Sequence, residues 1–372
     1  MHERRVLPHW ARRSPWWAGG GRVNDDVLLV GSIPLDTAEE VFRSFGATLG
    51  PSLKAMPDGE VGPRKHWISR VHYQVLAGHP ELEAVRHPAP ENGVERLNPR
   101  NAGDSWLFKV KDGVEQVRFG DSGWRLGYAR EALNSYFVFK TLREQGVLAR
   151  HLRFQVSLPS INSALPPRIF PNSADIAKVR PGYTDALAAE IGTIARKIPN
   201  ADLAIQWDCA TEVQDAYGSA SGPSSEARIE RNLDQFRRLS PLIPEAALLG
   251  YHFCFGTLGG WPRFAPPDLS ATVALANAVV ESSGRRVDWV HIPVLPDAGD
   301  AFLAPLKDLR PAGARVYLGV VHHMDGFDQR LAAARKYLPE FGLAGYCGFG
   351  RIPPNEIPAV LDDHVRAIKA AG

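Results

Sequence analysis

Short apolar runs alternate with longer amphipathic stretches over most of the chain. The first apolar run, 27–34, ends in a turn, and a second, shorter one covers about 53–56. From residue 151 onward the alternation is regular, and it predicts strands over 152–158, 203–208, 248–254, 287–292, 316–321 and 343–348. Short apolar runs that are bounded by turn residues are typical of buried strands.

Helices are predicted between these strands. Asp36 or Thr37 can cap the first helix, and Glu39 and Glu40 suit its first turn. Further helices are predicted over 129–145, 183–197, 225–239, 269–282, 300–309, 327–337 and 357–371. Eight strands, nearly all followed by a helix, predict a (β/α)8 TIM barrel rather than an open doubly wound sheet. The glycine-rich dinucleotide-binding motif does not follow the first strand.

The chain between the second and third predicted strands is less regular. Segments 106–110 and 114–119, separated by a Lys-Asp-Gly turn, predict a β-hairpin. We expect it to lie in an insertion after strand two, at about 90–127, within a single barrel domain over 27–372. Residues 1–26 are rich in Arg and Trp and lack the apolar segment of an export signal. They are interpreted as a flexible extension or as an arm that docks on a partner subunit or the barrel.

The composition excludes several classes of partner. The 372 residues include 43 basic and 41 acidic side chains, so no bulk charge attracts nucleic acid or a membrane surface. No apolar stretch is long enough to span a bilayer. Three cysteines in so long a chain argue against a disulfide framework and favour the reducing cytoplasm. A homodimer is compatible with the sequence.

Polar residues gather at the carboxyl ends of the predicted strands, where TIM barrels carry their functional sites. In chain order these residues are Ser32, Asp58, Glu60, Ser157, Ser160, Asp208, Cys209, His252, Cys254, His291, His322, His323 and Cys347. Two cysteines and several histidines therefore converge on one barrel mouth. His252 and Cys254, two positions apart on a strand, share a face.

We expect His252, Cys254 and Cys347 to bind zinc, with a fourth position open or weakly held. Ligands from separate strands suggest a catalytic ion, because structural zinc sites use compact cysteine knuckles that this chain lacks. Such a zinc suits a substrate thiol, whose pKa it would lower. His291 is a tentative fourth ligand, a substrate contact or a core histidine. Cys209 is expected to pack against the helices.

His322 and His323 are neighbours at a strand end. Because neighbouring positions of a strand face opposite ways, only one of the two can line the pocket. His322 is taken as the pocket residue, and His323 as a surface or supporting group. Arg64 and Lys65 could hold an anionic tail of a substrate, or they could be ordinary solvated charges.

Five short motifs bring these residues together in a recognisable order. They are Val30-Gly31-Ser32-Ile33-Pro34, Asp58-Gly59-Glu60, Gln206-Trp207-Asp208, His252-Phe253-Cys254 and Cys347-Gly348. With them, the chain from about Val27 onward resembles the catalytic C-terminal barrel of cobalamin-independent methionine synthase. That family belongs to the superfamily that also holds uroporphyrinogen decarboxylase.

The resemblance implies a role for each motif. Ser32 would help to hold the carboxylate of an amino-acid thiol, and Glu60 and Asp208 would contact its amino group. His252, Cys254 and Cys347 would be zinc ligands. The family's fourth ligand, a glutamate, is replaced here by His291, in Trp289-Val290-His291-Ile292-Pro293. The family's N-terminal barrel, which helps to bind the folate donor, has no counterpart in this sequence.

The sequence therefore favours zinc-dependent methyl or alkyl transfer to a small thiol. Folate, a corrinoid protein or a non-methyl electrophile such as an epoxide could supply the alkyl group. One alternative is a metal-free decarboxylase or lyase that acts on a carboxylated substrate, as in the wider superfamily. Another is a non-catalytic protein in which zinc is only structural.

Overall fold

The structure is a computed structural model, and it describes residues 27–120, 125–218 and 223–372. The predicted N-terminal extension or docking arm, 1–26, lies outside the described residues.

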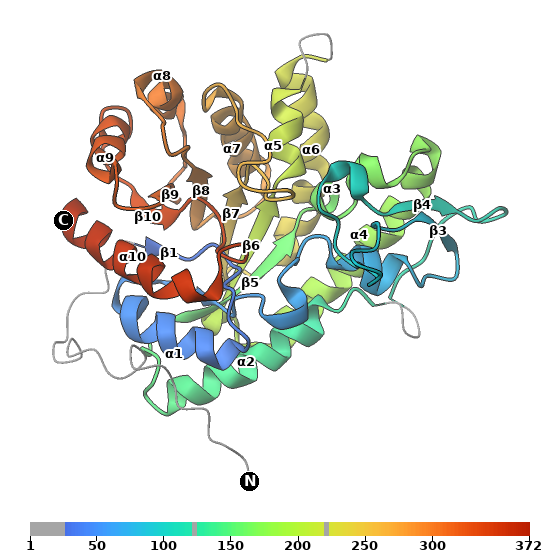
Figure 1. Ribbon diagram of the computed structural model, residues 1–372, viewed down its shortest axis with the longest axis horizontal. Coiled ribbons are helices and arrows are strands. Elements are labelled where there is room, and N and C mark those ends of the chain that lie inside the picture. The colour runs from blue at the N-terminus through green and yellow to red at the C-terminus, as the bar shows by residue number, and fades with distance from the viewer. Residues whose placement is uncertain (1–26, 121–124, 219–222) are drawn as a thin grey trace.

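Eight parallel strands form a nearly closed barrel, as predicted (Figure 1). In chain order they are β1 (Val27–Leu28), β2 (Ala55–Pro57), β5 (Arg153–Pro159), β6 (Leu203–Cys209), β7 (Leu248–Phe253), β8 (Trp289–Pro293), β9 (Arg315–Val321) and β10 (Gly342–Gly345). The sheet runs β1-β10-β9-β8-β7-β6-β5-β2, and a parallel bridge between Val27 and Leu53 links its two edges. The fold is a TIM barrel.

Helices surround this barrel (Figure 1). The longer ones are α1 (Ala38–Leu49), α2 (Tyr128–Glu144), α4 (Ser173–Lys197), α6 (Ser225–Leu239), α7 (Ser270–Ser282), α9 (Phe327–Arg335) and α10 (Ile357–Ala371). Short helices at strand ends are α3 (Ile161–Ala164), α5 (Thr211–Tyr217) and α8 (Asp300–Leu303). In the part of the chain that the structure describes, none of the helices has the length and apolar character needed to cross a membrane.

The cap of α1 is Thr37, one of the two predicted candidates. Its hydroxyl accepts from the Glu40 backbone N–H at 3.1 Å, and the Glu40 carboxylate accepts from the Thr37 backbone N–H at 3.1 Å. This reciprocal pair satisfies two N–H groups that a helix start otherwise leaves free. The helix therefore begins at a fixed point after the loop that carries Ser32.

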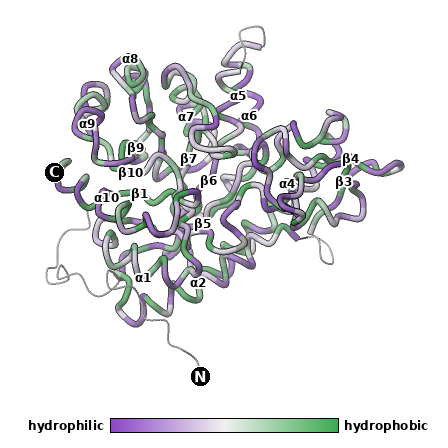
Figure 2. The backbone as a smooth tube through the Cα atoms, in the orientation of Figure 1, coloured by the Kyte–Doolittle hydropathy of each residue, from purple (hydrophilic) through white to green (hydrophobic). Residues whose placement is uncertain are grey.

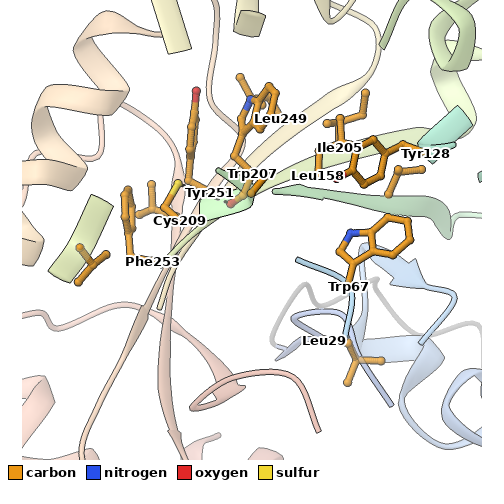
Figure 3. Close-up of a cluster of buried hydrophobic side chains, with 14 of the residues drawn as sticks. Leu29, Trp67, Tyr128, Leu158, Ile205, Trp207, Cys209, Leu249, Tyr251 and Phe253 are labelled. Carbon is orange, nitrogen blue, oxygen red and sulfur yellow. Dashed lines mark hydrogen bonds between the residues drawn. The ribbon is translucent and has the colours of Figure 1, made fainter. Parts of the chain in front are cut away.

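Alternation along the strands separates an outer apolar layer from the barrel interior. Trp207 and Cys209 of β6 lie with Tyr251 and Phe253 of β7 in the layer beneath the helices (Figure 3). Cys209 therefore packs in the apolar layer under the helices, as expected. Because Asp208 lies between two outward residues, its side chain faces the barrel interior. Hydropathy along the backbone likewise gathers apolar segments in the central strands (Figure 2).

The lower interior of the barrel is filled by a separate apolar cluster. Its members are Leu28, Ala55, Ala204, Leu248, Trp289, Tyr317 and Ala344. The Trp289 indole crosses over Gly250, where an added Cβ would stand 1.8 Å from its Cε2 atom. This part of the interior is therefore packed.

The hairpin prediction is half right. β4 (Leu107–Val110) covers its first strand, but the antiparallel partner is β3 (Leu82–Arg86), not 114–119. Val117 instead packs on α4, where its backbone N–H donates to Lys178 O at 3.0 Å. Gly182 of α4 allows this approach, since a Cβ there would meet Val117 O at 2.1 Å. The alternating apolar residues of 114–119 thus reflect burial against a helix rather than strand pairing.

The contact between Trp289 and Gly250 generates a stability prediction. We expect Gly250→Ala to lower the free energy of unfolding by about 1–3 kcal/mol, because the packed indole cannot move away without strain. The matched control is Gly192→Ala on α4, where a Cβ meets only the flexible end of Arg196 at 3.1 Å. The control should be neutral or up to about 1 kcal/mol stabilising. Equal denaturation midpoints for the two variants would contradict this account of the interior.

Candidate metal centre

Three buried donor atoms meet at the mouth of the barrel. His252 ends the interior face of β7, Cys254 follows directly after β7, and Cys347 lies just beyond β10. The Cys254 and Cys347 sulfurs are 3.3 Å apart, and Cys347 Sγ lies 3.6 Å from His252 Nε2. All three donor atoms lie within 4.8 Å of one another. The three predicted ligands are thus brought together.

Short backbone contacts fix the two cysteines. The Cys254 N–H donates to Cys209 O at 2.8 Å, which continues the β6–β7 ladder past the end of β7. On the other side, Phe349 N donates to Ser32 O at 2.6 Å. Gly348 permits this contact, because a Cβ there would stand 2.3 Å from Ser32 Oγ. The first and last barrel segments therefore hold Cys347 over the axis.

His291 does not extend a ring nitrogen to the metal position. Its Nε2 donates to Gly345 O at 3.0 Å, and its Nδ1 lies 2.7 Å from His252 Nδ1. The tentative assignment of His291 as a fourth ligand therefore disagrees with this geometry. The residue lies beside His252 in the β7–β8 register and supports it from behind.

These hydrogen bonds define the tautomer of His252. A carbonyl only accepts, so His291 Nε2 carries a proton. Burial lowers the pKa of His291 to about 4, so the ring is neutral and its Nδ1 must accept. His252 Nδ1–H is then the donor, and His252 Nε2 keeps its lone pair on the side of Cys347. This is the arrangement that a metal-bound histidine needs.

The donor set suits a zinc ion. A tetrahedral ion with sulfur at about 2.3 Å and nitrogen at about 2.0 Å needs donor separations of about 3.5–3.8 Å, close to those found here. Burial and the neighbouring His291 hold the pKa of His252 well below its usual value, so the imidazole is neutral. Hydrogen bonding to Cys254 and burial hold the pKa of Cys347 well above its usual value. A bound cation would reverse that preference and favour the thiolate.

Glu60 is held at the mouth in an unusual backbone conformation. Its φ is +49°, in the left-handed region that non-glycine residues seldom adopt. Asp58 stabilises this turn, since its carboxylate accepts from the Glu60 N–H at 2.9 Å and from Ser135 Oγ at 2.6 Å. Gly31 makes room for the Glu60 carboxylate, which a Cβ at that position would meet at 2.9 Å. Burial, and then Asp208 and Asp58, raise the pKa of Glu60 well above its usual value.

Asp208 belongs to a polar layer beneath the donors. Gln206 Nε2 donates to Asp208 Oδ1 at 2.9 Å and to Val30 O at 2.7 Å, and Gln206 Oε1 accepts from Trp289 Nε1 at 3.3 Å. Burial raises the pKa of Asp208 to about 7. Two buried carboxyl groups with raised pKa values thus lie at one barrel mouth, where they favour a cationic partner.

A cavity of about 140 Å³, partly open to solvent, joins these groups. It is lined by most of the residues expected at the site, namely Ser32, Glu60, Lys65, Asp208, His252, Cys254 and Cys347. His322 is not among its lining residues. The imidazole of His322 instead stacks on Tyr346 at 4.9 Å and bonds to Val294 O at 2.7 Å.

Two other basic groups occupy structural positions. Arg64 is buried and pairs with Asp58 at 2.5 Å, so it braces the Glu60 turn and does not hold a substrate tail. His323, taken as a surface or supporting group, is largely exposed, 3.6 Å from an Asp363 carboxylate oxygen.

The sequence reading missed several residues of the cavity wall. They are His66, Trp67, His72, Arg168, Arg263 and Arg351. They come from loops and short helical turns rather than from strand ends, so strand periodicity gives no signal for them. The clue in the sequence was the position of Arg351, four residues beyond the predicted metal ligand Cys347.

Comparison with known proteins supports the fold. No protein-family model matches the sequence, and no curated protein matches it either. Among solved structures, a B12-independent methionine synthase from Shewanella sp. W3-18-1, in complex with selenomethionine, is similar with a TM-score of 0.56 at 11% identity. The match covers 93% of this chain and 98% of that one. A protein from Listeria monocytogenes, assigned as a vitamin-B12-independent methionine synthase, matches with a TM-score of 0.48 at 12% identity, over 90% and 86%.

The supporting position of His291 generates a prediction about zinc affinity. His291→Phe should weaken zinc binding by about 10–100-fold, because it removes the acceptor that orients His252. Zinc affinity is measured by competition with a chelator. His252→Ala, which removes a donor atom, is the comparison and should cost more. An unchanged affinity in His291→Phe would contradict the supporting role, and a loss as large as that of His252→Ala would make His291 a ligand.

Proposed function

We propose that this protein transfers a methyl or alkyl group to a small thiol, with zinc held by His252, Cys254 and Cys347. The observation that carries the proposal is the meeting of two thiols and one tautomerically defined imidazole in a cavity that also contains carboxylates. Three protein ligands leave a tetrahedral ion one open position. Zinc there would bind the substrate sulfur and lower its pKa, so that it reacts as a thiolate.

The protein residues orient the thiol. The carboxyl groups of Glu60 and Asp208 are buried, burial and Asp208 raise the pKa of Glu60, and both carboxyl groups favour a bound ammonium group. Ser32, held against Gly348, provides a hydroxyl on the same wall. These contacts favour a thiol that also carries an amino group, such as homocysteine. Fixing that thiol beside the donor lowers the entropic part of the barrier.

The reaction is a displacement at carbon. The thiol would release its proton to solvent, its sulfur would form a bond to the carbon of the alkyl group, and the donor would keep the electron pair of the bond that breaks. The ligand charges support this assignment, because two thiolates and a neutral imidazole balance a divalent ion. Such a neutral centre is a weak Lewis acid for water but keeps a bound thiolate nucleophilic.

The chain offers a built-in control for the metal assignment. Zinc content of the purified protein should be close to one per chain, and Cys254→Ala and Cys347→Ala should each lose most of it. Cys209→Ala should keep it, since Cys209 packs in the outer apolar layer. Elemental analysis measures all four proteins. Full zinc in both Cys254→Ala and Cys347→Ala would overturn the site assignment.

The carboxylates generate a prediction about the acceptor. Asp208→Asn should weaken homocysteine binding by about tenfold, the cost of a charge-assisted hydrogen bond. Binding of 2-mercaptoethanol, which has no amino group, should be nearly unchanged. The affinity of each thiol can be measured in cobalt-substituted protein from the change in the cobalt absorption spectrum when the thiol is added. An equal loss for both thiols would show that Asp208 acts on the metal site rather than on the substrate.

The alternative is a metal-free decarboxylase or lyase that acts on a carboxylated substrate. The observation that favours it is the presence of arginines in the same cavity. Full turnover in metal-free protein would select this alternative. The choice between the two reactions therefore depends on the metal analysis.

A further inference from the structure

Two arginines face the cavity from loops that come from different strands. Arg168 lies in a short turn after α3, and Arg263 lies in the loop that follows β7. Both side chains are half-buried, and across the described residues neither guanidinium has a carboxylate within 4.0 Å, whereas the buried Arg64, Arg228 and Arg330 all have polar partners. Two cations without a carboxylate partner in one cavity favour the binding of an anion.

The Arg263 loop is built to present its side chain. Arg263 N donates to Gly256 O at 3.0 Å, and Phe264 N donates to Phe255 O at 3.1 Å, so the loop folds back on itself. Gly256 has a φ of +78°, and a Cβ there would stand 3.2 Å from Arg263 Cβ. A glycine is therefore required where the arginine packs.

Arg168 is anchored by one nitrogen only. Its Nε donates to the buried Ser105 Oγ at 3.4 Å, and its terminal amino groups have no acceptor in the described part of the chain. Burial, and then the charge of Arg263, lower the pKa of Arg168 to about 10. Both guanidinium groups line the same cavity. The free amino groups of Arg168 suit a bidentate oxyanion.

A neutral histidine next to Arg168 adds an acceptor. His72 lines the same cavity, is buried, and bonds through Nε2 to Ala164 O at 2.8 Å. Its Nδ1 has no partner. Burial lowers the pKa of His72 to about 4, with a further contribution from Arg168. This side of the cavity can therefore accept one hydrogen bond while it binds negative charge.

Arg351 belongs to the metal side of the same cavity. Its neighbours include Cys347, Glu60 and Cys254, whose charges act on its pKa, and it bonds to His66 Nδ1 at 2.5 Å. For Arg168, by contrast, burial and Arg263 are the causes of the lowered pKa. Arg351 also lies four residues beyond Cys347, whereas Arg168 comes from the turn after α3 and Arg263 from the loop after β7. Arg351 is therefore assigned to the thiol, which leaves Arg168 and Arg263 for a second molecule.

We infer that Arg168 and Arg263 bind a carboxylate or phosphate group of the alkyl donor, opposite the thiol at the metal. The assignment of the anion to a donor rests on the proposed function, whereas the anion site rests on the two arginines alone. This anion site would restrict the alkyl donor to electrophiles that carry a negatively charged group.

The test is a calorimetric titration of the zinc-loaded protein at low ionic strength. Inorganic phosphate and glutarate are used in separate titrations, which distinguishes the two kinds of anion. At least one should bind saturably, and Arg168→Gln and Arg263→Gln should each weaken it by about tenfold or more. The control is Arg237→Gln, an exposed arginine of α6 that pairs with Glu230 at 2.6 Å, and it should bind like the wild type. No binding of either anion, or unchanged binding in both pocket variants, would overturn the site.

Two further measurements separate the possible causes of a loss. Phosphate should slow phenylglyoxal modification of Arg168 in the wild type, as measured by peptide mass spectrometry; this test needs no variant to fold. Homocysteine should not displace the anion; competition between them would assign the arginines to the thiol's own carboxylate and overturn the donor assignment. If the purified protein contains no zinc, the proposed function fails; arginine-dependent anion binding in that protein would still leave the anion site intact.

Discussion

Closure of the barrel is the constraint on which the candidate site depends. β1 pairs with β10, and a bridge from Val27 to Leu53 joins the other edge. Through this closure the loop after β1 meets the segment after β10, so that Ser32 touches Gly348 and Cys347 reaches Cys254. Residues that lie 93 positions apart in sequence thus become neighbours. A barrel that opened at β1 would separate one sulfur from the other donors.

Within the closed barrel, charge is arranged around the donor atoms in a consistent way. The Gly345 carbonyl, His291 and His252 form a chain of hydrogen bonds in which each bonded ring nitrogen either donates or accepts. This chain leaves the lone pair of His252 Nε2 for a metal. Gln206 fixes Asp208 from below, while Asp58 fixes the strained turn of Glu60. Burial raises the pKa of Glu60 and Asp208 and lowers the pKa of His252, so this mouth disfavours charged forms of these groups when it holds no cation. A divalent ion and an ammonium group would each favour the charged forms, so metal and thiol binding support one another electrostatically.

The sequence predicted the barrel and the meeting of His252, Cys254 and Cys347 at its mouth because both follow from regular alternation. Strand periodicity identifies which residues end on the interior face, and His252, Cys254 and Asp208 obey it. It could not distinguish His291 as ligand from His291 as support, since that depends on where the Gly345 carbonyl lies. The prediction that 114–119 forms the second strand of the hairpin was wrong, because the apolar residues of this segment are buried against α4. Nothing in the local sequence pattern indicates that contact. Arg168 and Arg263 were missed because loops, not strands, bring them into the cavity.

The most direct test of the central claim is X-ray absorption at the zinc edge of the purified protein, before and after addition of homocysteine. The account predicts two sulfur ligands and at least one nitrogen ligand in the free protein, and a third sulfur at about 2.3 Å in the presence of the thiol. An unchanged sulfur shell after saturation with thiol, or the absence of zinc from protein that still turns over, would contradict it.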